Sequence, residues 1–213
     1  RAEALLKTAL ASKPDFPEAH VVLASILEAR GSVPAAIAAL EAALALRPDY
    51  GGALRNLGML HYRLQRWHEA AGTLSRAAAA DSANADARFW LGNALAHLER
   101  FEEAAASYRG ALEIRPEHPE SLCRLGNVLA DLGRRDEAIG YLQRALALDP
   151  RLAEAQVGLG NLRAAEQKFE EAAALYRAAI GNEPRNVQAR VNLGNALVYL
   201  GEAEGAREAG LDF

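Results

Sequence analysis

Apolar residues recur along the chain at helical spacing, and short breaks separate them at regular intervals. One stretch places leucines on a single helical face, at Leu122, Leu125, Leu129 and Leu132. A Gly-Arg break follows, and a second amphipathic stretch then runs from Glu137 to Leu146. Pro150 closes it, because proline disfavours helical geometry in the residue before it. The pattern predicts two helices joined by a short turn.

This two-helix unit repeats with a period of 34 residues. Leu-Gly pairs mark the period, at Leu57-Gly58, Leu91-Gly92, Leu125-Gly126, Leu159-Gly160 and Leu193-Gly194. Alanines follow at fixed distances, as Ala138 and Ala145 do after Leu125-Gly126. Because such periodicity is typical of repeat architectures, we expect one continuous array. The predicted units are a partial unit at 1–16, full units at 17–50, 51–84, 85–118, 119–152 and 153–186, and a shortened unit at 187–213.

The spacing of Leu-Gly, Ala, aromatic, Ala and Pro resembles the tetratricopeptide repeat along the whole chain. Its small residues let two antiparallel helices approach closely. The resemblance implies an all-α, right-handed superhelical solenoid of antiparallel helix pairs, forming a single domain over residues 1–213. First helices would line a concave surface and second helices the outer one. The repeats are also loosely similar to the arms of O-linked N-acetylglucosamine transferases, notably at residues 13–20, although that family's asparagines lie one place earlier relative to leucine.

Composition and charge narrow the function classes. The formal net charge is −4 and basic residues are scattered, so we expect no nucleic-acid partner. No window is apolar and long enough to span a membrane, so we expect no membrane insertion. A single cysteine, Cys123, allows no internal disulfide and suits a reducing compartment. We therefore predict a soluble cytoplasmic protein.

Residues able to carry catalysis do not converge in the sequence. The five histidines show no paired metal-ligand spacing, and Cys123 lies within a first helix without a positioned base. Acidic pairs such as Glu102-Glu103 recur at the starts of second helices, where they complement the helix dipole. We expect no enzymatic activity, no cofactor and no bound metal.

The predicted concave surface carries a ladder of asparagines. The position two residues after the repeat leucine is asparagine in four consecutive repeats, at Asn93, Asn127, Asn161 and Asn195. A carboxamide offers donors and an acceptor that match the backbone of an extended peptide. The alternative is that these amides bond the neighbouring repeat.

Aromatic and basic residues accompany the ladder in the middle repeats. We predict a partner-binding patch formed by Arg55, Asn56, Met59, Tyr62, Phe89, Trp90 and Arg124, with Phe89 and Trp90 as anchors. Aromatic side chains beside arginine are typical of interface hot spots. The expected partner is a protein or an extended peptide lying in the groove.

Two other functions stay open from the sequence. The chain could be the substrate-recruiting arm of a larger enzyme, of the glycosyltransferase or sulfotransferase type. It could also self-assemble into homo-oligomers through uncapped ends, since a terminal repeat usually presents a polar surface and this end offers Leu211 and Phe213.

Overall fold

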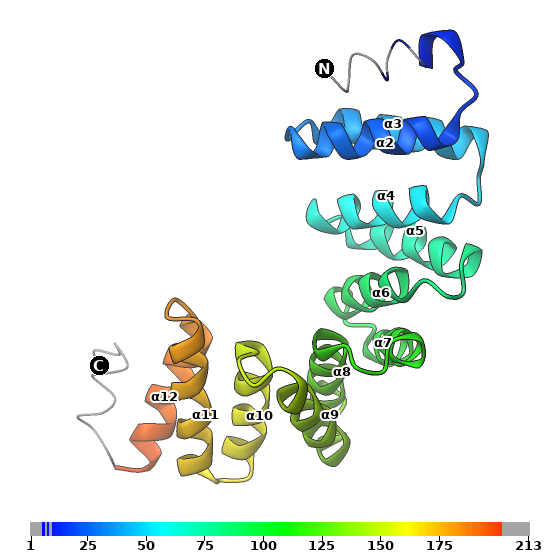
Figure 1. Cartoon of the computed structure of the whole chain (residues 1–213). Helices are drawn as coiled ribbons and strands as arrows, with labels where there is room; N and C mark the ends of the chain where they lie inside the picture. Colours follow the sequence, from blue (N-terminus) through cyan, green and yellow to red (C-terminus); the bar gives the residue numbers. More distant parts are fainter. Residues whose placement is uncertain (1–5, 7, 9, 202–213) are drawn as a thin grey trace. The chain divides into compact units, whose positions relative to one another are not determined.

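The computed structural model describes residues 6, 8 and 10–201, and the regular secondary structure of these residues is entirely helical (Figure 1). First helices are α2 (Pro17–Ala29), α4 (Gly51–Arg63), α6 (Ala85–His97), α8 (Pro119–Asp131), α10 (Ala153–Ala165) and α12 (Val187–Tyr199). Second helices are α3 (Val33–Leu46), α5 (Trp67–Ala80), α7 (Phe101–Ile114), α9 (Arg135–Leu148) and α11 (Phe169–Asn182). The predicted helix pairs and their 34-residue spacing are confirmed.

The turn after each first helix has one recurring backbone conformation. A residue with positive φ stands there at the same point of every repeat, namely Gly31, Gln65, Glu99, Gly133, Gln167 and Gly201. Glycine adopts this left-handed conformation without strain. Three repeats use glycine and three use Gln or Glu, which explains why only some of the breaks stand out in the sequence.

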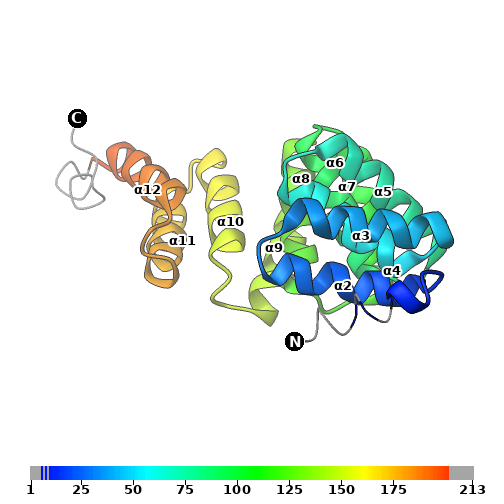
Figure 2. The ribbon, with the colours of Figure 1, turned by 90° about the horizontal axis from the view of Figure 1, so that it is seen from above.

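The helices group into two compact units, within which their residues make most of their contacts. Unit 1 spans residues 1–114 and contains α2 to α7, and unit 2 spans 115–213 and contains α8 to α12. Within the units, α3, α5, α9 and α11 each pack against the first helix before and the first helix after, and α7 packs against α6 (Figure 2). Neighbouring first helices also touch, α4 with α6 in unit 1, and α8 with α10 and α10 with α12 in unit 2. No comparable contact joins neighbouring second helices of the described residues, so first helices lie on the inner side of each stack.

The repeat glycine is required by the packing within each helix pair. A Cβ added at Gly92 would lie 2.6 Å from the Tyr108 ring, and one added at Gly126 would lie 2.7 Å from Cγ of Leu142. Gly58 and Gly160 meet Leu74 and Tyr176 in the same way, at 2.5 and 2.6 Å. The predicted role of glycine in close helix approach is confirmed, because a side chain at these four positions would collide with the residue packed against it.

Aromatic residues on second helices α5, α7 and α11 divide into two groups. Tyr108 and Tyr176 are buried. Trp67, Phe101 and Phe169, each at the start of a second helix, are only partly buried. The start of a second helix is therefore a site where an aromatic ring remains partly open to solvent.

Enlarging an alanine tests which helix face is packed. Ala138 is fully buried, and its carbonyl oxygen lies 3.2 Å from the position a Cβ would take at Gly126. We expect Ala138→Leu to lower the free energy of unfolding by about 1–3 kcal/mol through overpacking. Ala130→Leu, on the partly exposed side of α8, should cost much less. Equal losses in urea denaturation would contradict the assignment of faces.

Some sequence predictions lie outside the described residues. Leu211 and Phe213, proposed as an uncapped end, are among them, as is most of the partial unit at 1–16. That the array is one domain stays a prediction. Among the described helices, none combines the length and the apolar character needed to cross a membrane.

Candidate functional site

The predicted site residues lie on the first helices. We call the side of each unit formed by its first helices the first-helix surface of that unit, with α4 and α6 in unit 1 and with α8, α10 and α12 in unit 2. On α4, Arg55, Asn56 and Met59 are partly buried. The Arg55 guanidinium donates to Oδ1 of Asn56 from Nε at 3.3 Å and from Nη2 at 3.2 Å. This bond orients the Asn56 carboxamide, whose Nδ2 remains the donor group for other acceptors.

Aromatic rings form a connected cluster in unit 1. We call it the aromatic cluster; its members are Tyr62, Trp67, Phe89, Trp90, His97 and Tyr108. Tyr62 packs edge-on against Trp67 at 4.9 Å and Trp90 at 5.2 Å between ring centroids. Phe89 contacts Trp90 at 5.5 Å, and its centroid lies 6.0 Å from that of Tyr108. Edge-on contacts of this kind stabilise beyond area burial. Phe89 and Trp90 therefore have packing partners that the sequence pattern did not reveal.

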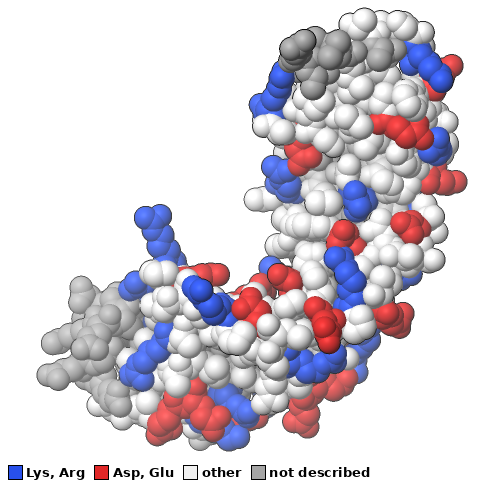
Figure 3. Space-filling view, viewed as in Figure 1, with Lys and Arg blue, Asp and Glu red and all other residues white. Residues whose placement is uncertain are grey.

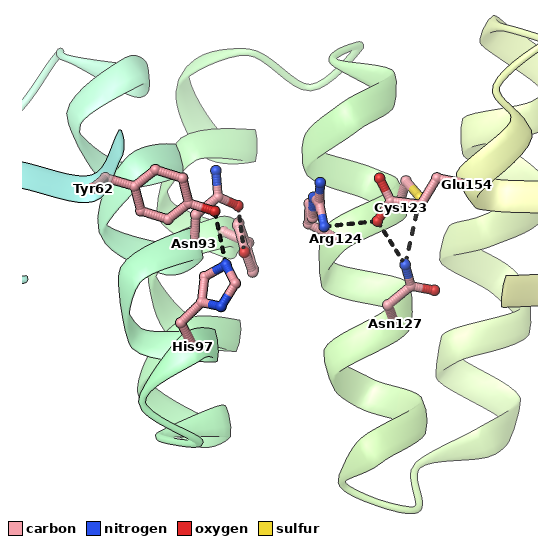
Figure 4. A network of polar contacts seen from close by, with 8 residues as sticks. Tyr62, Asn93, His97, Cys123, Arg124, Asn127 and Glu154 are labelled. Carbon is pink, nitrogen blue, oxygen red and sulfur yellow. Dashed lines mark hydrogen bonds and ion pairs between the residues drawn. The ribbon is translucent and has the colours of Figure 1, made fainter. Parts of the chain in front are cut away.

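A histidine closes the cluster on its solvent side. His97 stacks on Trp67 at 4.1 Å, with ring planes 5° apart, and its Nε2 is hydrogen-bonded to the Tyr62 hydroxyl at 3.0 Å (Figure 4). His97 itself is exposed, while Tyr62, Trp67 and Trp90 are partly buried. The cluster thus holds aromatic rings in fixed positions and leaves part of their surface accessible.

The four asparagines of the ladder have different surroundings. Asn93 is 6% exposed, and its Oδ1 accepts a hydrogen bond of 2.7 Å from the Tyr108 hydroxyl. This bond joins the two helices of one pair, so it agrees with the alternative that the amides serve the repeats themselves. Asn161 and Asn195 are exposed, and Asn127 is partly buried. The exposed members lie in unit 2.

Asn127 belongs to a polar network with charged neighbours. Its Nδ2 donates to Oε1 of Glu154 at 3.1 Å, and Nη1 of Arg124 lies 2.9 Å from the same oxygen (Figure 4). Arg124 is exposed. The shared carboxylate neutralises the arginine, so this part of α8 presents an oriented amide and no uncompensated charge.

Cys123 belongs to this network, since its Sγ accepts a weak hydrogen bond from Nδ2 of Asn127 at 3.7 Å, and it is buried, with 1% of its surface exposed. Burial raises the pKa of its thiol far above the ordinary value, and the nearby Glu154 carboxylate raises it further. The thiol therefore stays protonated and packs as a small apolar group. In the part of the chain that the structure describes, His, Cys, Asp and Glu form no group that could hold a metal ion.

Two hollows open on the units. One in unit 2, of about 200 Å³, lies on the first-helix surface and is lined by Asn161, Asn192, Asn195, Phe169, Tyr176 and Tyr199. The other, of about 500 Å³, lies in unit 1 between second helices α5 and α7, above Leu91 and Leu95 of α6. Sequence reasoning missed Asn192, Phe169 and Tyr199. The signal was available, because Phe169 and Tyr199 stand 30 residues apart, as Trp67 and His97 do.

Charged side chains of both signs are interspersed on the face drawn in Figure 3. Elsewhere in the sequence, residues three apart form ion pairs at helix ends, as Arg100 does with Glu103 at 2.7 Å and Arg163 with Glu166 at 2.8 Å. Exposed pairs of this kind contribute little to stability. The interspersed signs leave the face drawn in Figure 3 without a dominant charge.

Comparison with known proteins gives a family match over nearly the whole chain. The tetratricopeptide repeat family matches residues 1–51, 55–119, 123–180 and 157–212. A search of curated protein sequences found no match.

Solved structures give the same fold. YrrB, described as a TPR protein with an unusual peptide-binding site, is 25% identical with a TM-score of 0.76, over 89% of this chain and 97% of that chain. PilF of Pseudomonas aeruginosa is 21% identical with a TM-score of 0.77, over 91% of this chain and 88% of that chain. MamA is 20% identical with a TM-score of 0.71, over 78% of this chain and 97% of that chain. The last two likenesses concern the fold alone.

Proposed function

The chain belongs to the tetratricopeptide repeat family, and from that premise we propose that it is a non-catalytic scaffold that binds a protein or an extended peptide along its first-helix surface. Repeats of this family generally mediate protein interactions. The likeness to YrrB, whose description names a peptide-binding site, supports the proposal.

The observation that carries the proposal is the aromatic cluster. Tyr62 and Trp90 lie on adjacent first helices, are held by edge-on contacts and remain partly exposed. Large aromatic side chains dominate binding energy at interfaces, and rings already fixed in place lose little conformational entropy on binding. On α4, Met59 lies about one helical turn before Tyr62 and Arg55 about two turns before it. Both residue types are enriched at interfaces, so they extend the surface.

Unit 2 would contribute amides on its own first-helix surface. Asn161 and Asn195 are exposed on α10 and α12, and Asn127 on α8 is oriented by Glu154. Carboxamides bond a peptide backbone without reading its side chains. Asn93 is buried and bonded to Tyr108, so its proposed role is to fix α6 against α7.

We expect Trp90→Ala to weaken binding by about 2 kcal/mol or more, near 30-fold in Kd, because it removes an interface anchor. The binder is first selected from a displayed peptide library on the wild-type chain and then titrated by calorimetry. Tyr141→Ala is the matched control, since Tyr141 is partly exposed but lies on second helix α9. Its affinity should equal that of the wild type.

Replacing Asn127 and Asn161 together by alanine should weaken binding further and lower the melting temperature modestly, because the buried Tyr176 hydroxyl loses its acceptor on Asn161. The melting temperature of each variant is measured first, and every titration is made well below it. A loss of affinity then reflects lost contacts with the partner and not unfolding of the variant. If Trp90→Ala and the double variant both bind as the wild type does, the first-helix surface is not the binding surface.

A further inference from the structure

The hollow of about 200 Å³ in unit 2 combines amides with aromatic rings and has no charged lining. We call it the amide pocket; Asn161, Asn192, Asn195, Phe169, Tyr176 and Tyr199 define it. Pockets for small molecules usually measure about 300–1,000 Å³. The amide pocket is smaller than that range, so its size suits one side chain of a larger partner.

Hydrogen bonds within the pocket set its polarity. Gln188 donates from Nε2 to Oδ1 of Asn192 at 2.8 Å, and Asn192 in turn donates from Nδ2 to Oδ1 of Asn161 at 2.6 Å. The Tyr176 hydroxyl donates to that same Asn161 oxygen at 2.9 Å. Burial raises the pKa of Tyr176 to about 12, so its hydroxyl carries the proton that it donates. Both lone pairs of the Asn161 oxygen are therefore in use.

The group that Asn161 has left to offer is its Nδ2. No acceptor for it is present among the described residues, and Asn161 is exposed. At this point the pocket therefore offers an amide N–H group as a hydrogen-bond donor and has no free hydrogen-bond acceptor. Such a site suits a carbonyl oxygen and disfavours ammonium and guanidinium groups, which only donate.

An aromatic platform stands beside the donors. Tyr199 stacks on Phe169 with ring centroids 4.6 Å apart and planes 7° apart, yet 72% of Tyr199 remains exposed. One face of the stacked Tyr199 ring is thus covered by Phe169, and the tyrosine is otherwise largely open. The pocket thus combines an aromatic ring held in place with an N–H donor for a carbonyl oxygen. This combination suits a polyproline II segment, because its carbonyls have no internal hydrogen bonds and its proline rings pack on aromatic surfaces.

We propose that the amide pocket binds a proline-containing extended segment of a partner protein, with the proline ring against Tyr199 and a backbone carbonyl accepting from Nδ2 of Asn161. This inference rests on the proposed function and names the chemistry of the partner at one site of unit 2. The lining carries no Asp, Glu, Lys or Arg, so recognition there rests on amide hydrogen bonds and ring contacts.

The test uses the full chain and two capped nonapeptides, one of proline and glycine and one in which alanine replaces every proline. Titration calorimetry should show binding of the proline peptide. The alanine peptide should bind at least about tenfold more weakly, because it lacks both the proline rings and the preformed extended backbone. Equal affinity for the two peptides, or no binding of the proline peptide, would overturn the proposal.

Two variants locate the site. Asn161→Asp keeps an oxygen for Tyr176 and Asn192 and replaces only the outward amide by a carboxylate oxygen, so it should bind the proline peptide about tenfold more weakly while melting as the wild type does. Tyr199→Ala removes the platform and should weaken binding at least as much. Tyr141→Ala, on α9, is the matched control and should bind normally.

If Asn161→Asp and Tyr199→Ala both bind the proline peptide with wild-type affinity, the amide pocket is not its site and the inference fails. The proposed function is judged separately, by the effect of Trp90→Ala in unit 1 on the partner selected without regard to proline. A loss there together with no effect at Asn161 would refute the amide pocket alone.

Discussion

Replacing Tyr108 by alanine is expected to lower the free energy of unfolding by about 3–5 kcal/mol, the usual range for removing a buried aromatic ring. The Tyr108 side chain is fully buried and lies against Gly92, where a Cβ would be only 2.6 Å from its ring. Its loss would leave a cavity between α6 and α7. It would also leave the Asn93 oxygen, 6% exposed, without its donor.

The hydroxyl and the ring of Tyr108 can be separated. Tyr108→Phe keeps the ring and removes the 2.7 Å bond to Asn93, so we expect a loss of about 1–3 kcal/mol for an unsatisfied buried acceptor. Tyr141→Ala, at a partly exposed position, should cost less than about 1 kcal/mol. Urea denaturation followed by circular dichroism measures all three. A Tyr108→Phe variant as stable as the wild type would mean that Asn93 does not depend on this bond.

The second large effect is expected at Leu142 in unit 2. This leucine is fully buried, and its side chain is 2.7 Å from a Cβ built on Gly126 and 3.3 Å from one built on Gly158. It therefore joins α9 to the first helix of its own pair and to that of the next. We expect Leu142→Ala to lower the free energy of unfolding by about 2–5 kcal/mol, since the rigid helices cannot collapse onto the space.

A compensating change tests this geometry. Gly126→Ala alone should destabilise, because its methyl group would collide with Leu142. Combined with Leu142→Ala, the added methyl enters the vacated space, so the double variant should lose less stability than the two single losses added together. Leu148→Ala is the control, since Leu148 ends the same helix and is 43% exposed. Simple additivity would show that the two residues do not share one space.

The helices and their spacing could be predicted from the sequence because both depend on local features. Apolar residues at i, i+3 and i+4, proline at the close of a unit and glycine opposite a large side chain each act within one helix pair. The glycines at 58, 92, 126 and 160 were therefore assigned correctly without coordinates. The left-handed turn residues Gln65, Glu99 and Gln167 were not recognisable, because their residue types do not favour that conformation.

The candidate site was predictable only as a set of positions. Asn93 and Asn161 occupy the same place in their repeats, and each accepts a bond from a tyrosine 15 residues later, yet one is buried and the other exposed. The residue 15 positions after Asn127 is Leu142, which has no hydrogen-bond donor. The amide of Asn127 bonds to Glu154 instead.

The sequence by itself determined the repeat, the pairing of helices and the residues that allow close packing, because these follow from local hydrogen bonding and from side-chain size at fixed spacing. The tertiary structure alone decided which polar and aromatic groups are accessible. Trp90 and Tyr62 meet across two helices, and Tyr199 stacks on a residue 30 positions earlier. Such contacts depend on which side chains the neighbouring repeats bring, so a position's own residue type does not reveal whether its group is already bonded or still available to a partner.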